Sequence, residues 1–220
     1  MLKCFKDNNE DADALLDSYI KLYNDCLSEF PANFHIGVHL GGRHFSEGGY
    51  DAIAMKLFRN LNVDTYYLEY DTPRAGGFEP LKELPKGKNV ILGLITSKFP
   101  ELENMDEMKQ KVYQAAELIA QGTGESKEEA LNILGVSPQC GFASHSDGNN
   151  VGKEDMIKKL QLVRKLADYI WPGQPWVWRY RIGRHEAMVR GISTIDDGAS
   201  QKFEHVRSGA SYYENKATSH

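Results

Sequence analysis

Cysteine is scarce in this sequence, and its spacing excludes two classes of protein. Cys4, Cys26 and Cys140 are the only cysteines among the 220 residues, and no two of them form a Cys-x-x-Cys motif. An odd number of widely spaced cysteines argues against a disulfide-stabilised scaffold and against a structural zinc knuckle. The chain is therefore expected to work in a reducing compartment.

Long apolar runs and an excess of basic residues are also lacking. No segment approaches the roughly 18 consecutive apolar residues of a membrane span, and the amino-terminal sequence MLKCFKD has no apolar core of the kind found in signal peptides. The 31 acidic residues outnumber the 26 basic ones, which gives a net charge of −5. Nucleic acids and anionic membranes both require a basic face. We therefore expect neither as a partner, and we expect a cytoplasmic protein.

What the sequence does have is an alternation of apolar strands and amphipathic helices. The continuous apolar run Val90–Ile95 is typical of a parallel strand that is covered on both faces. In the segment 10–29, apolar residues recur with a helical period and predict one buried stripe that includes Cys26 as a core residue. The expected order is helix 10–29, strand 34–40, helix 50–61, strand 63–70, strand 90–95, helix 105–121, helix 126–134, strand 134–139 and helix 153–170. This order predicts an α/β fold with a parallel sheet.

Three of the four predicted strands end at a side chain that can bind zinc. His39 lies near the end of the first strand, Glu69 lies near the end of the second, and Cys140 follows the fourth. In a barrel of parallel strands the carboxyl ends converge on one rim, so these side chains are expected to meet. Nitrogen, carboxylate and thiolate ligands all suit Zn²⁺, and three protein ligands with an open fourth position are typical of a catalytic site.

Two of these residues also have an ordinary structural interpretation. A cysteine at the end of an apolar strand is, by itself, about twice as often an inert core residue as a metal ligand. Glu69 lies within the aromatic run Tyr66–Tyr70, where an uncompensated carboxylate would cost several kcal/mol. A salt bridge to Arg74 is the ordinary alternative, and for Glu69 taken alone it is the better explanation.

Five longer motifs resemble one family of enzymes. They are GVHL (37–40), HFSEGGYD (44–51), YLEYD (67–71), GFEPL (77–81) and SPQCGFAS (137–144). Together they resemble the carboxyl-terminal catalytic barrel of cobalamin-independent methionine synthase, in particular its shorter single-barrel relatives in fungi and bacteria, over about residues 10–171. The resemblance implies a partial (β/α)8 TIM-type barrel, about its C-terminal half, in residues 1–171. Residues 172–220 show no clear period and are expected to be a poorly ordered, irregular C-terminal extension.

The resemblance implies zinc-dependent methyl transfer to a thiol, usually that of homocysteine, from a methylated folate or another methyl donor. His39, Glu69 and Cys140 then correspond to zinc ligands of the family, and the partners are a small-molecule thiol and its methyl donor. Zinc holds a thiol as the nucleophilic thiolate, and the folate nitrogen must be protonated as its bond to the methyl group breaks. Lys98 lies at the approximate position of the family's proton-donating histidine, where it is either that donor or a solvated loop lysine.

Other polar residues on the same rim have roles that the sequence leaves open. Asp71 and Arg74 either face the substrate or pair with each other. The family has a second cysteine two residues after its zinc-binding histidine, whereas Gly41 occupies that place here. His44 is then either a substitute ligand or a loop residue.

Half a barrel would have two open sheet edges, and we expect self-association through them. The rival interpretation is a non-catalytic truncated barrel that serves as an interaction module or is an inactive fragment. A metal-free relative of the decarboxylase type is disfavoured, because such an enzyme would use arginines around an acidic substrate and arginine is nearly absent at these strand ends.

Overall fold

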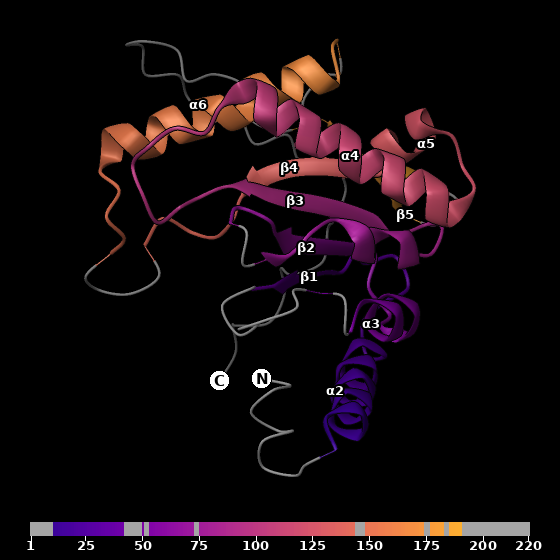
Figure 1. Cartoon of the computed structure of the whole chain (residues 1–220). Coiled ribbons are helices and arrows are strands. Elements are labelled where there is room, and N and C mark those ends of the chain that lie inside the picture. The colour runs from indigo at the N-terminus through magenta and orange to yellow at the C-terminus, as the bar shows by residue number, and fades with distance from the viewer. Residues whose placement is uncertain are drawn as a thin grey trace, which may run out of the picture.

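The structure, a computed structural model, describes residues 11–41, 50, 53–72, 75–143, 148–173, 177–182 and 185–190. Its centre is a four-stranded parallel sheet with the order β1-β2-β3-β4 (Figure 1). The strands are β1 (Gly37–Leu40), β2 (Thr65–Glu69), β3 (Asn89–Ile95) and β4 (Leu134–Pro138). The helices are α2 (Ala12–Leu27), α3 (Ala54–Asn60), the 3-10 helix η3 (Glu79–Glu83), α4 (Met105–Thr123), α5 (Lys127–Asn132) and α6 (Lys153–Ile170). The predicted α/β fold with part of a TIM-type barrel is confirmed.

The helices α4 and α5 begin at side chains that satisfy free amide groups of the first turn. Asn104 precedes α4, and its side-chain oxygen accepts hydrogen bonds from two amides of that turn. The helix ends at Gly124, whose φ of 71° is a left-handed conformation that favours glycine. Ser126 and Glu129 form a capping box at the start of α5. These residues mark where α4 begins and ends and where α5 begins.

The two faces of the sheet differ in character, because successive strand residues point to opposite faces. One face carries Val38, Leu40, Tyr66, Leu68, Val90, Leu92, Leu134 and Val136, which belong to the hydrophobic core or pack against it. The other face carries His39, Tyr67 and Ile91 in one row, followed by Glu69, Gly93 and Ser137. Figure 1 shows α4 and α6 alongside β3 and β4, with α2 and α3 on the side of β1. The polar side chains of the sheet are thus on the face opposite to the core.

The apolar stripe of α2 is mostly exposed, and the prediction that it is buried was wrong. Leu22 is 58% exposed and Tyr23 is 53% exposed, and Cys26 is also exposed rather than a core residue. Only Ala12 and Ile20 of this helix are buried. The physical reason is the position of α2 beside β1, which is the outer strand of the described sheet. A helical stripe is buried only if a second layer covers it.

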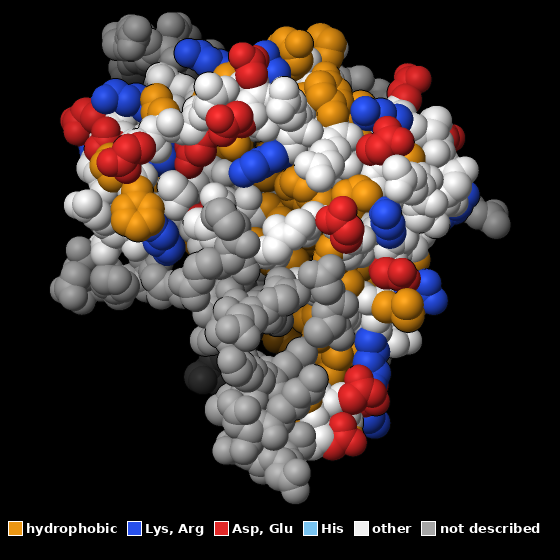
Figure 2. All heavy atoms as spheres, viewed as in Figure 1, with side chains coloured by type: hydrophobic (Ala, Val, Ile, Leu, Met, Phe, Trp, Pro, Cys, Tyr) orange, Lys and Arg blue, Asp and Glu red, His pale blue; other side chains and the backbone are white. Residues whose placement is uncertain are grey.

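The segment after α6 contains two strands that the sequence did not predict. β5 (Val177–Ile182) and β6 (His185–Arg190) pair as an antiparallel hairpin within this segment. The boundary near residue 171 stays a prediction. Within the ranges that the structure describes, no helix combines the length and the apolar character needed to span a membrane. Figure 2 shows acidic and basic side chains interspersed over the visible face.

Candidate metal centre

Three strands bring His39, Glu69 and Cys140 together at the carboxyl end of the sheet. His39 lies in β1, Glu69 is the last residue of β2, and Cys140 follows β4 by two residues. The thiol of Cys140 donates a hydrogen bond to Oε1 of Glu69 at 2.7 Å, and its Sγ lies 3.6 Å from Nε2 of His39. Nε2 of His39 lies 3.4 Å from Oε1 of Glu69. One donor atom of each residue therefore lies within 4.8 Å of the other two.

These separations fit a zinc ion with one adjustment. In a tetrahedral site with zinc–ligand bonds of 2.0–2.3 Å, ligand atoms lie about 3.3–3.8 Å apart. The distances of 3.4 and 3.6 Å from His39 Nε2 match this geometry. The 2.7 Å contact between Cys140 and Glu69, in which the thiol proton faces the carboxylate, is shorter than this range. Loss of that proton would remove this hydrogen bond and allow both atoms to coordinate one ion.

The carboxylate of Glu69 is buried, so water does not solvate its charge. Its side chain is 5% exposed, whereas that of His39 is 48% exposed. A buried carboxylate costs several kcal/mol unless it is paired, hydrogen-bonded or bound to a metal. Here the thiol of Cys140 and the imidazole of His39 face it. Arg74, the alternative partner expected from the sequence, lies outside the described residues.

The thiol of Cys140 is held in its protonated form when no cation is near. Burial is the main cause that raises the pKa of Cys140 to about 11, and the hydrogen bond to Glu69 and the charge of that carboxylate add to it. The ammonium group of Lys98 acts in the opposite direction. Lys98 therefore lies within electrostatic reach of the sulfur, at the same rim. A metal cation at the site would favour the thiolate far more strongly.

Cys140 reaches Glu69 across the intervening strand β3. In the sheet, Glu69 is paired with Gly93 of β3, and Gly93 is paired with Ser137 of β4. The register between β3 and β4 shifts just after Gly93, and the amide of Gln139 donates to the carbonyl of Ile95 at 2.8 Å. The chain thus turns over the end of β3 directly after β4, which directs Cys140 toward β2.

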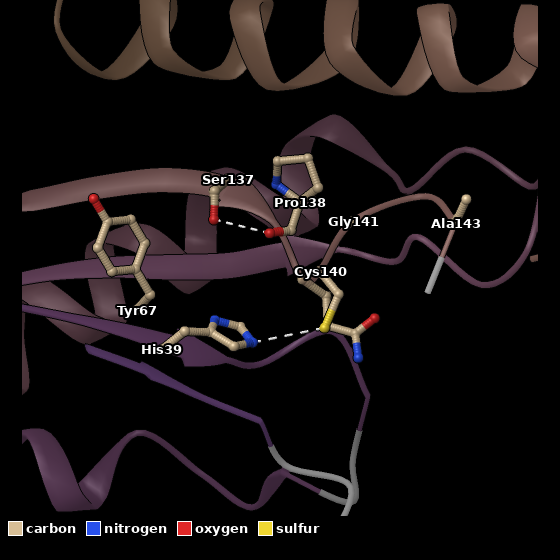
Figure 3. A pocket seen from close by; sticks show the side chains of 8 residues that line it. His39, Tyr67, Ser137, Pro138, Cys140, Gly141 and Ala143 are labelled. Atoms are coloured by element: carbon tan, nitrogen blue, oxygen red, sulfur yellow. Dashed lines mark hydrogen bonds between the residues drawn. The ribbon is translucent and has the colours of Figure 1, made fainter. Parts of the chain in front are cut away.

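A cavity of about 550 Å³ opens beside His39 and Cys140. It is lined by His39, Tyr67, Ser137, Pro138, Gln139, Cys140, Gly141 and Ala143. Figure 3 shows the ring of His39 and the sulfur of Cys140 pointing toward one another, while the hydroxyl of Tyr67 points away from the sulfur. The volume is sufficient for a small ligand, and the sulfur and imidazole lie on its wall.

Asp71 lies near the candidate metal centre but is not one of its three candidate ligands. Its side chain forms a hydrogen bond with Thr96, and burial together with the charge of Glu69 raises the pKa of Asp71. Its predicted pairing with Arg74 concerns a residue outside the described ranges, as does the alternative ligand His44. In the part of the chain that the structure describes, no second cysteine joins the group of three ligands.

Two residues that shape this site were missed in the sequence. Gly93 interrupts the apolar strand 89–95, and a glycine inside a strand is a signal of close backbone approach. Tyr50 gives no such local signal, because its partners are backbone groups that are distant in sequence. Its hydroxyl contacts the backbone of Leu40 and Glu69.

Comparison with known proteins decides the family. The profile of the family described as "Cobalamin-independent synthase, Catalytic domain" matches residues 27–169, which include all three candidate ligands. The chain belongs to the catalytic-domain family of cobalamin-independent methionine synthase. The family's general chemistry is methyl transfer in methionine biosynthesis, and the resemblance seen in the sequence motifs is confirmed.

Two bacterial proteins and one solved structure are similar to this chain. The chain is 38% identical over 165 residues to the uncharacterized protein YxjG of Bacillus subtilis, covering 72% of the chain and 41% of YxjG. It is 36% identical over 167 residues to the uncharacterized protein YxjH of the same organism, covering 73% and 42%. A crystal structure from Listeria monocytogenes, provisionally named a vitamin-B12 independent methionine synthase, matches with a TM-score of 0.53 and 30% identity over 73% of this chain and 42% of that one. The chain thus spans about two fifths of the length of these relatives.

Proposed function

We propose that this member of the methionine synthase family binds one zinc ion through His39, Glu69 and Cys140 and methylates a small-molecule thiol. The observation that supports this most directly is the convergence of three chemically suitable donor atoms within 4.8 Å at the carboxyl rim of the sheet. This is the end at which barrels of this type carry their active sites. Family membership supports homocysteine as the acceptor and a methylated folate as the donor.

The bound zinc would supply a positive charge that keeps a substrate thiol ionised near neutral pH. In the transfer, the sulfur lone pair forms a bond to the methyl carbon, and the electron pair of the broken carbon–nitrogen bond stays on the donor nitrogen. That nitrogen must gain a proton as the bond breaks, because an amine anion is a poor leaving group. Lys98 is the proposed proton donor, since its ammonium group lies within electrostatic reach of Cys140 at the rim.

The remaining candidate residues would hold the substrates. Asp71 is partly buried beside Glu69, where its carboxylate could accept hydrogen bonds from the amino group of an amino-acid thiol. Arg74 is the proposed partner for the carboxylate of the same substrate, because a guanidinium binds a carboxylate through two parallel hydrogen bonds. The cavity of about 550 Å³ would receive the thiol and the methyl-bearing end of the donor.

The proposal is tested by measuring both zinc affinity and methyl transfer. The purified chain is titrated with zinc against a chelator, and product formation is followed with homocysteine and a methylated folate. Cys140→Ala should abolish both, because it removes the only sulfur among the described ligands. Cys26→Ala is the matched control, since Cys26 is exposed on α2, and it should leave both unchanged. Zinc binding by Cys140→Ala equal to that of the unchanged chain would contradict the proposal.

A non-catalytic role is the second candidate, and one observation favours it. The described parallel sheet has four strands, whereas a complete barrel of this class has about eight. In that case the chain would bind zinc through the same residues and yet transfer no methyl group from any donor to any thiol. The two measurements above therefore separate a zinc-binding fragment from an enzyme.

A further inference from the structure

The hydroxyl of Tyr50 lies between the ends of β1 and β2. It donates a hydrogen bond to the carbonyl of Leu40 at 2.8 Å and accepts one from the amide of Glu69 at 2.9 Å. The residue is 1% exposed, and its ring meets that of Tyr70 edge-on with centroids 5.4 Å apart. Tyr50 thus contacts the backbone of the ligand Glu69 and of Leu40, the residue that follows the ligand His39.

This hydroxyl lies at the last hydrogen-bonding position of the ladder between the two strands. At the start of the ladder, the amide of Thr65 donates directly to the carbonyl of Ile36 at 3.2 Å. In a parallel ladder the same pattern repeats every two residues along each strand. The equivalent pair at the other end is the amide of Glu69 and the carbonyl of Leu40. The oxygen of Tyr50 hydrogen-bonds to both of these groups.

One oxygen that binds the carbonyl of Leu40 and the amide of Glu69 holds the two strand ends together. This link lies where His39 and Glu69 project from neighbouring strands, with their donor atoms 3.4 Å apart. We propose that Tyr50 is a positioning residue of the metal site, whose hydroxyl joins the strand ends that carry His39 and Glu69. This inference rests on the proposed zinc site.

Replacement of Tyr50 by phenylalanine tests the hydroxyl alone, because the ring and its packing are kept. Without the hydroxyl, the amide of Glu69 and the carbonyl of Leu40 lose a shared partner. The strand ends that carry His39 and Glu69 are then held less firmly. Because groups that orient metal ligands contribute to affinity, we expect zinc to bind about 10- to 100-fold more weakly to Tyr50→Phe.

Tyr66 offers a matched control in the same sheet. It is also fully buried, and its hydroxyl lies 3.3 Å from the carbonyl of Leu57 and 3.4 Å from those of Phe58 and Leu61. These carbonyls are at the end of α3, on the face opposite to His39 and Glu69. Tyr66→Phe removes a comparable buried hydroxyl, so its thermal stability should fall as that of Tyr50→Phe does, while its zinc affinity should stay within about 2-fold of the unchanged chain.

A metal-free measurement separates failure of this inference from failure of the proposed function. Hydrogen exchange at the amide of Glu69, followed by NMR without zinc, should be slow in the unchanged chain and in Tyr66→Phe, and at least about 10-fold faster in Tyr50→Phe.

Unchanged exchange at Glu69 in Tyr50→Phe, or equal losses of zinc affinity in the two variants, would overturn the role of Tyr50. If Tyr50→Phe does not fold, fast exchange at Glu69 in the unchanged chain would overturn it. Equal zinc binding by the unchanged chain and Cys140→Ala would instead contradict the zinc site, and the exchange result would still decide whether Tyr50 joins the strand ends.

Discussion

Gly93 and Gln139 approach each other so closely that a Cβ on Gly93 would lie 3.0 Å from the Cα of Gln139. The same Cβ would lie 3.0 Å from the carbonyl oxygen of Leu68. Both neighbours are backbone atoms, so neither can rotate away. The missing side chain of Gly93 is therefore what lets the chain after β4 pass over β3 and bring Cys140 to Glu69.

Gly93→Ala should displace Gln139 and Cys140 and weaken zinc binding. Overpacking at a site of this kind costs about 1–3 kcal/mol of unfolding free energy, and here part of the strain would be relieved by moving the sulfur away from Glu69. Zinc affinity and chemical denaturation measure the two effects. Gly152→Ala at the start of α6 is the control, because its Cβ would meet only side-chain atoms, the nearest being Oδ2 of Asp155 at 3.4 Å. Equal zinc affinity in Gly93→Ala and Gly152→Ala would contradict this account.

Lys98 is predicted to contribute a proton and not merely a positive charge. Lys98→Met should lower the rate of methyl transfer by about 10²- to 10⁴-fold, the usual contribution of a positioned acid, with zinc still bound. Lys98→Arg should not restore the rate, because a guanidinium keeps its proton. Single-turnover kinetics with zinc-loaded protein provide the measurement.

The control for Lys98 is Lys86→Met, which removes a lysine that precedes β3 and pairs with Glu125 at 3.4 Å. This variant should be as active as the unchanged chain. Full recovery of the rate by Lys98→Arg would show that the charge of Lys98, and not its proton, is required.

Lys159 of α6 is predicted to be a major determinant of stability. Its side chain is 0% exposed, and its Nζ contacts the carbonyl of Glu101 at 2.6 Å and Oε1 of Glu103 at 3.1 Å. Oε1 of Glu103 also accepts the amide of Thr96 at 2.7 Å, so this pair fixes the loop that carries Lys98. Lys159→Met should cost about 3–5 kcal/mol of unfolding free energy, because the carboxylate of Glu103 would remain without its partner.

The neighbouring Lys158 provides the comparison for Lys159. Its side chain is 58% exposed and lies 3.7 Å from Oδ1 of Asp155, and exposed pairs of this kind contribute about 0–1 kcal/mol. Urea denaturation of Lys158→Met and Lys159→Met measures the difference in unfolding free energy between the two variants. The double variant Lys159→Met with Glu103→Gln should recover part of the loss, because it removes both charges. Similar stabilities for the Lys158 and Lys159 variants would show that the buried pair is unimportant.

The exposed face of α2 is predicted to support self-association. A shallow groove beside it is lined by Leu16, Tyr19, Ile20, Tyr23, Val38, Leu40, Leu57 and Leu61, and Leu22 is exposed on the same helix. β1, next to this groove, is an outer strand of the described sheet, and open strand edges pair readily with other chains. Sedimentation velocity should show an average mass that rises with concentration.

Leu22→Lys should shift this association to higher concentration, because a charge would then have to be buried. Leu102→Lys is the control, since Leu102 is 51% exposed in the loop before α4, away from α2. A monomer at every concentration tested would contradict the prediction.

The sequence predicted the four strands of the parallel sheet and the convergence of the candidate ligands for a simple physical reason. Apolar runs such as Val90–Ile95 are recognisable in isolation, and parallel strands bring their carboxyl ends to one edge whatever their spacing in sequence. His39, Glu69 and Cys140 could therefore be selected before their distances were known. The structure adds the separations of 2.7, 3.4 and 3.6 Å between their donor atoms.

Other features could not be predicted because they depend on contacts with segments that are distant in sequence. The period of α2 shows which face is apolar, but not whether another layer covers Leu22 and Tyr23, which are exposed. The role of Tyr50 depends on backbone groups of two strands, which leave no pattern in sequence. The pattern of 177–182 contains alternating polar and apolar residues, and its pairing with 185–190 became visible only in the structure.

X-ray absorption spectroscopy of the zinc-loaded chain tests the central claim most directly, because it counts the sulfur atoms bound to the metal. We expect one sulfur at about 2.3 Å together with nitrogen and oxygen ligands at about 2.0–2.2 Å, and we expect the sulfur shell to disappear in Cys140→Ala. A spectrum without sulfur in the unchanged chain, or an unaltered sulfur shell in Cys140→Ala, would contradict a metal centre built from His39, Glu69 and Cys140.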